Sequence, residues 1–185
     1  MALNKNTVIN FVLFQAGWFA CVLGAANKLP WFGVIFLGIF LIWHLSHANQ
    51  PKLELILIAI ALLIGGLYDL IMTRNQLLTY QSHGWITALP AAWILALWAE
   101  FAMTLNVSLR WLKNIKTGRW FIAILFGAIG GPLAYIGAAK LGAVTIDALP
   151  LSYVALSVGW AIITPILLLL SDKFDGFKPN ELAQI

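Results

Sequence analysis

Charged side chains are scarce in this sequence of 185 residues: they make up 10% of the positions, whereas hydrophobic residues make up 62%. A soluble domain of this size carries more charge, and it carries far fewer tryptophans than the nine found here. The composition therefore excludes an ordinary soluble domain and predicts an all-α, polytopic membrane protein.

Cysteine and histidine are also rare. The single cysteine, Cys21, excludes an intrachain disulfide and any C-x-x-C motif. Three histidines are too few for the clusters of membrane di-iron desaturases. His44 and His47 lie three residues apart with Glu54 close by, but an isolated H-x-x-H is a weak metal signal, and we predict a solvated helix end. A phosphate-binding glycine loop and a nucleophile elbow are both absent, and we predict no cofactor and no metal.

Long apolar runs are abundant, and six of them are long enough to cross a hydrocarbon core of about 30 Å. Four of these runs begin at a proline, whose missing N–H lies among the unpaired donors of a first helical turn. They are Pro30, Pro51, Pro90 and Pro150. We predict a single domain, residues 1–185, with six transmembrane helices near 8–26, 30–47, 52–72, 88–110, 119–140 and 150–170.

Lysine and arginine are unevenly divided between the two sides that these helices would define. The side of the termini holds Lys5, Lys52, Arg110, Lys113, Lys116, Arg119, Lys173 and Lys178, and the other side holds Lys28, Arg74 and Lys140. By the positive-inside rule both termini lie in the cytoplasm, and we predict a multi-pass protein of the bacterial inner membrane surrounded by membrane lipid. Basic residues are not interleaved with aromatic residues on a soluble face, so we predict no nucleic-acid partner.

Glu100 lies at the middle of the apolar run from Leu89 to Leu109, where a carboxylate costs about 2.5 to 3.5 kcal/mol. At 100° per residue, Trp93, Thr104 and Trp111 share its helix face, which we expect to point into the bundle. The ligand-binding site predicted around this residue comprises Glu100, Thr104, Trp93, Asp69, Tyr135 and Gln15.

Asp69 lies about one turn from the outer end of the third predicted helix. It is interpreted either as structural, in an ion pair with Arg74 or Lys140 or in a helix-end contact, or as part of an outward mouth leading toward Glu100. The outward loop that follows, from Thr73 to Thr87, is either an interfacial segment or a surface loop.

The fifth predicted helix carries small-residue faces and a central Gly130-Gly131-Pro132, which predicts a kink. A kink at the depth of an intramembrane acid fits either a transport site or plain packing. Small residues on the first helix, Ala16, Ala20 and Gly24, could also dock a membrane-protein partner, as could the fifth helix.

Four sequence segments resemble the signature segments of a bacterial inner-membrane family, domain of unknown function 2878. They are LFQAGWFACVLGA (13–25), LYDL (67–70), FAMTLNVSLRWL (101–112) and GGPLAYIGAAKLGAV (130–144). The resemblance implies a similar size and helix count, and gene neighbours that modify membrane lipids. The positions matching these segments include Gln15, Trp18, Asp69, Thr104, Asn106, Trp111, Pro132 and Tyr135, whereas Glu100 lies just outside them.

Three functions remain open at the level of the sequence. The first is binding or moving a lipid-like amphiphile or small solute in a pocket between the third, fourth and fifth helices, with Glu100 as polar anchor. The second is a membrane-embedded enzyme or accessory subunit acting on acyl chains, with Glu100 as acid or base and Tyr135 or Thr104 assisting. The third is a substrate-binding module of a larger importer, because size and helix number resemble vitamin-binding S components.

Overall fold

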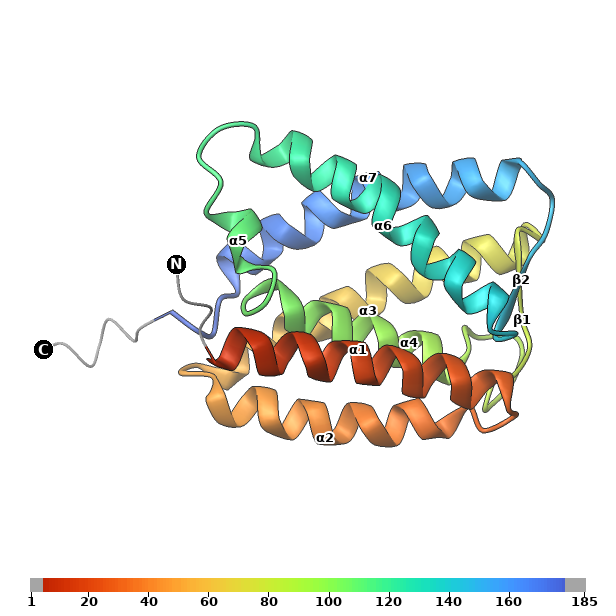
Figure 1. Ribbon diagram of the computed structural model, residues 1–185, viewed down its shortest axis with the longest axis horizontal. Helices are drawn as coiled ribbons and strands as arrows, with labels where there is room; N and C mark the ends of the chain where they lie inside the picture. The colour runs from red at the N-terminus through yellow and green to blue at the C-terminus, as the bar shows by residue number, and fades with distance from the viewer. Residues whose placement is uncertain (1–4, 179–185) are drawn as a thin grey trace, which may run out of the picture.

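The computed structural model describes residues 5–178 (Figure 1). This part of the chain forms seven helices and one two-stranded ladder. Their bounds are α1 Lys5–Ala26, α2 Trp31–His47, α3 Pro51–Arg74, β1 Leu78–Tyr80, α4 Ala92–Leu105, α5 Arg110–Lys113, α6 Arg119–Lys140, β2 Val144–Ile146 and α7 Leu151–Lys173.

Four of the helices, α1, α3, α6 and α7, are long and apolar enough to span a membrane. Each has 22 to 24 residues, which corresponds to about 33 to 36 Å at 1.5 Å per residue. The predicted class, a helical membrane protein, is confirmed to that extent. The apolar helices α2 and α4 are shorter, with 17 and 14 residues.

Helix α4 is the centre of the bundle. It packs against α1, α2, α3 and α7, and twelve of its 14 residues are buried. In Figure 1 α1 and α2 lie on one side of it, and α6 and α7, which cross each other, lie on the other. Protein therefore covers α4 on most sides, so little of this short helix faces the surroundings of the bundle.

The helix predicted over 88–110 is shorter in the structure. It begins two residues after Pro90, because the loop before it is held by the hydrogen bond that the indole of Trp85 donates to the Pro90 carbonyl (2.6 Å). It ends at Leu105, where Asn10 from α1 donates to the Met103 carbonyl and accepts from the Ser108 amide. A nearby loop residue thus holds the start of α4, and a residue of a distant helix holds its end.

The strands pair antiparallel, with Thr79 opposite Thr145, and close the end of the bundle opposite α5 (Figure 1). The outward loop predicted after the third helix therefore contains a strand. Thr79 donates to Asp147 at 2.7 Å, and Gln81 donates to Thr145 at 2.8 Å. This ladder forms a small cap over one end of the helices.

One glycine of each small-residue face packs closely within the chain. A Cβ atom at Gly127 would lie 2.2 Å from the Trp160 carbonyl oxygen, and one at Gly24 would lie 2.8 Å from the Leu29 carbonyl oxygen. The first pair brings α6 onto α7, and the second brings α1 close to the turn that enters α2. Helix α6 continues through Pro132 as one element.

Candidate functional site

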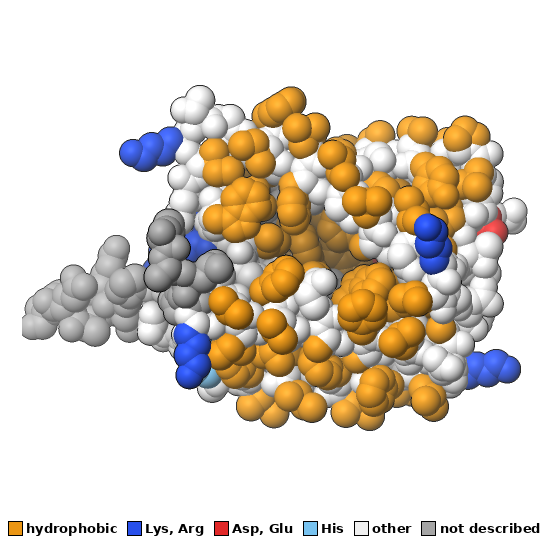
Figure 2. Space-filling model, in the orientation of Figure 1, with side chains coloured by type: hydrophobic (Ala, Val, Ile, Leu, Met, Phe, Trp, Pro, Cys, Tyr) orange, Lys and Arg blue, Asp and Glu red, His pale blue; other side chains and the backbone are white. Residues whose placement is uncertain are grey.

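A cavity of about 410 Å³ lies between α1, α4, α6 and α7. Figure 2 shows a hollow on the face where α1 and α6 border it, surrounded by hydrophobic side chains. Its size is in the usual range of small-molecule sites. None of its nineteen lining residues is charged, and nine are aromatic: Phe14, Trp18, Phe19, Trp93, Trp98, Phe101, Phe126, Tyr135 and Trp160.

The inner wall of the cavity is a stack of two indoles. Trp98 of α4 and Trp160 of α7 lie 4.6 Å apart at an interplanar angle of 11°, and Phe101 meets both rings edge-on. Two glycines make room for them: a Cβ atom at Gly65 would lie 1.9 Å from the ring of Trp98, and one at Gly131 would lie 2.1 Å from the ring of Trp160. These glycines therefore fix the position of the wall.

Asp69 lies behind this wall and is fully buried. Its carboxyl group accepts three hydrogen bonds, from the hydroxyl groups of Tyr80 (2.5 Å) and Tyr135 (2.6 Å) and from the indole of Trp98 (2.5 Å). All three partners donate, which is the pattern that an ionised, acceptor-only carboxylate makes. Burial and the nearby Asp69 charge raise the pKa of Tyr80 well above its ordinary value, so its hydroxyl stays a donor.

This arrangement differs from the ion pair considered for Asp69. Among residues 5–178, no cation pairs with its carboxyl group, and Arg74 instead donates to the Ala88 carbonyl at 3.4 Å. Two of the three donors, Tyr135 and Trp98, line the cavity. Asp69 thus holds two side chains of the cavity wall to a tyrosine of the cap.

Glu100 lies outside the cavity. It is fully buried and faces α1, where a Cβ atom at Gly17 would lie 2.5 Å from both of its carboxyl oxygens. In the described part of the chain, neither oxygen has a hydrogen-bond partner. The expected pocket between the third, fourth and fifth helices is therefore displaced toward α1 and α7, and Glu100 is at the α1–α4 contact.

The other predicted site residues divide between the cavity and its surroundings. Gln15 and Trp93 line the cavity, and the indole of Trp93 donates to the Ser82 carbonyl at 2.9 Å. Thr104 is buried and donates to the Phe101 carbonyl of its own helix. Trp111 leaves the predicted face because α4 ends before it, and 49% of its surface is exposed.

A second polar cluster lies at the opposite end of the bundle, near α5. Glu54 accepts from the side chain of Asn106 and from the backbone amide of Gly176, both at 2.7 Å, and lies 2.8 Å from the Nε2 atom of His44. His47 lies apart from this pair and stacks on Trp43. In the part that the structure describes, no three potential metal ligands come together.

Three charged side chains complete this cluster: Arg110, Lys113 and Asp175. Lys113 donates to Asp175 at 2.8 Å and to the side chain of Asn106 at 2.6 Å, and Arg110 donates to Asp175 at 2.6 Å. Burial lowers the pKa of Lys113. Burial alone would raise the pKa of Asp175, but Lys113 and Arg110 bring it below its ordinary value. The cluster fastens the turn after α4 to the segment after α7.

Sequence reasoning did not select Trp98, Phe101 or Trp160 as site residues. One signal was available: Trp98 and Phe101 lie three residues apart on one face of a buried helix. No such signal exists for Trp160, because its place in the wall depends on how α7 packs against α4.

The comparisons with known proteins give a family without an assigned activity. Neither a curated protein nor a solved structure matches the chain. A family model described as "Protein of unknown function (DUF2878)" matches residues 7–166, which is most of the sequence. The chain therefore belongs to the DUF2878 family.

Proposed function

We propose that this protein binds, and in doing so carries or presents, a lipid-like amphiphile in the cavity between α1, α4, α6 and α7. One observation carries the proposal: an uncharged, aromatic cavity opens sideways on an apolar face of the bundle (Figure 2). A side opening on a face of this kind admits a ligand from the lipid phase. It suits a molecule whose apolar chain is already dissolved there.

We further propose that the chain crosses the inner membrane six times with both termini in the cytoplasm. Successive long helices run in opposite directions, and the described ends of the chain lie at the same end of the bundle (Figure 1). The α5 region at that end contributes Arg110, Lys113, Lys116 and Arg119, in agreement with the positive-inside rule. The cavity then opens at the depth of the hydrocarbon core.

The proposed site is centred on Trp98, Trp160 and Tyr135 rather than on Glu100. Asp69 is a positioning residue, because it holds Trp98 and Tyr135 without lining the cavity itself. Its carboxyl oxygens are already occupied by three donors, so this geometry favours a binding role over proton transfer by Asp69.

Filling the cavity tests the proposal. Ala134 lines the cavity on α6, and Ile129 on the same helix is exposed and outside it. We expect native mass spectrometry of the gently purified wild type to show a defined bound amphiphile, which Ala134→Trp loses and Ile129→Trp retains. Equal occupancy in both variants, or only unselective phospholipid in all three proteins, would contradict the proposed function.

A further inference from the structure

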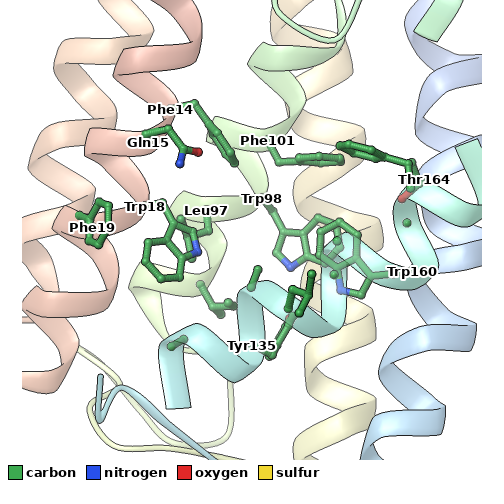
Figure 3. Close-up of a pocket in the computed structure, with 18 of the residues that line it drawn as sticks. Phe14, Gln15, Trp18, Phe19, Leu97, Trp98, Phe101, Tyr135, Trp160 and Thr164 are labelled. Carbon is green, nitrogen blue, oxygen red and sulfur yellow. The ribbon is translucent and has the colours of Figure 1, made fainter. Parts of the chain in front are cut away.

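The α1 wall of the cavity carries two polar groups that the protein leaves unused. Figure 3 shows the carboxamide of Gln15 and the indole nitrogen of Trp18 directed toward the cavity, on the side facing Trp98. Neither group makes a hydrogen bond to any residue from 5 to 178. Gln15 lies near the middle of α1 and is exposed, at a depth where lipid offers few hydrogen-bond partners.

A third unused donor lies on the opposite wall. Trp160 lines the cavity, and its buried indole nitrogen has no partner within the described chain. The neighbouring polar groups of Trp98 and Tyr135 are unavailable, because both donate to Asp69. The hydroxyl of Thr164 also lines the cavity without a partner in the described chain. All four free polar groups of the cavity can therefore donate, and two of them, the indoles, can only donate.

The charges around the cavity disfavour an ionised ligand of either sign. No charged side chain lines it, so an anionic head group would be buried without a counter-charge and close to the Asp69 carboxylate. A cationic head group would find the Asp69 oxygens occupied by three donors. An uncharged acceptor satisfies the free N–H groups without either difficulty.

We infer that the cavity selects an uncharged amphiphile whose head group presents a hydrogen-bond acceptor, such as an ester or ketone carbonyl, to Gln15, Trp18 and Trp160. The inference rests on the proposed function, because it names the class of amphiphile that the same cavity takes. The aromatic walls bind the apolar chain of the ligand, and the donors of Gln15, Trp18 and Trp160 select its head group.

Four probes with the same sixteen-carbon chain separate these two properties. They are methyl hexadecanoate, hexadecanoate, hexadecyltrimethylammonium and hexadecane, each added to the full-length protein in detergent and followed by native mass spectrometry. We expect the ester to bind at least about tenfold more tightly than the other three, as one or two added hydrogen bonds would give. Gln15→Leu and Trp18→Phe should reduce that preference, whereas the exposed Trp111→Phe should leave it unchanged.

Two results would overturn the inference. One is tighter or equal binding of the carboxylate or the ammonium probe, the latter pointing to an aromatic cage for cations. The other is an ester preference that persists in both Gln15→Leu and Trp18→Phe. If all four probes bind equally and Ala134→Trp abolishes binding, head-group selection fails while the proposed function stands. If none binds, the proposed function fails with it.

Discussion

Replacing Asp69 should be the most damaging single polar substitution in the half of the bundle next to the β1–β2 cap. The fully buried carboxyl group accepts from Tyr80, Tyr135 and Trp98 at 2.5 to 2.6 Å, and all three partners are buried as well. In Asp69→Ala these donors lose their acceptor together. Each buried, unsatisfied donor costs about 1 to 3 kcal/mol, so the expected loss of stability is about 3 to 9 kcal/mol.

Two milder variants grade the effect. Asp69→Asn keeps one oxygen as an acceptor but replaces the other with an NH₂ group, which points either toward Trp98 or toward the tyrosines. About one donor is then unsatisfied, and the expected loss of stability is about 1 to 3 kcal/mol. Tyr135→Phe removes one hydrogen bond and leaves two on the carboxyl group, at about 1 kcal/mol. The expected order of stability is wild type, Tyr135→Phe, Asp69→Asn and then Asp69→Ala.

Thermal unfolding in detergent, followed by size-exclusion chromatography with fluorescence detection, measures this order. Thr73→Val is the matched control on the same helix, because the Thr73 hydroxyl donates only to carbonyls of its own helix, Asp69 and Leu70. An Asp69→Ala protein as stable as the wild type would refute the reasoning. So would equal losses in Asp69→Asn and Asp69→Ala, because the shared acceptor would then not be what matters.

Three further predictions concern other parts of the bundle. Glu100→Leu should keep or raise the free energy of unfolding, by up to about 1 to 3 kcal/mol, and keep bound ligand, because it removes an unpartnered buried carboxyl group. A loss of ligand in native mass spectrometry would return Glu100 to the site. Gly65→Ala should lower stability by about 1 to 3 kcal/mol or more, because the added Cβ atom clashes with Trp98. Gly38→Ala, with open space around it, should be neutral or stabilising by about 1 kcal/mol, and similar effects at both positions would contradict this prediction. Asp175 has a lowered pKa in the folded protein, so its contribution to stability is present above the ordinary pKa near 4 and is lost as the pH falls below that value. Asp175→Asn should therefore flatten the acid end of a plot of melting temperature against pH, and an unchanged plot would argue against the Lys113–Asp175 pair.

The helices could be predicted closely from the sequence because their signal is local. A run of about twenty apolar residues is visible without knowing its neighbours, and Pro51 begins α3 as expected. The end of α4 depends on Asn10, which is 93 residues from Met103 in the sequence. The pairing of β1 with β2 depends on residues far apart in the sequence, such as Thr79 and Thr145, which are 66 residues apart. Contacts of this kind leave no local pattern.

The candidate site could be predicted only in part for a related reason. Helical periodicity shows on which face of a helix Trp93 and Glu100 lie, but it does not show which neighbouring helix packs against that face. The sequence therefore identified an intramembrane carboxyl group as unusual without indicating whether a cavity or a glycine would face it. In the structure Glu100 faces Gly17, and the cavity lies on the adjacent side of α4.

Two of the buried acids, Asp69 and Glu100, consequently differ in how their surroundings treat the carboxyl group. The Asp69 carboxyl group accepts from two hydroxyl groups and one indole, so its surroundings suit an acceptor. These hydrogen bonds link Tyr80, in strand β1 of the cap, to the cavity wall. Glu100 has none in the described chain, so its environment is built for close approach of two helices. A ligand that shifts Trp98 or Tyr135 must therefore disturb the cap through Asp69, and hydrogen exchange of the β1 amides should respond to cavity ligands, whereas a polar contact at Glu100 gives no such route.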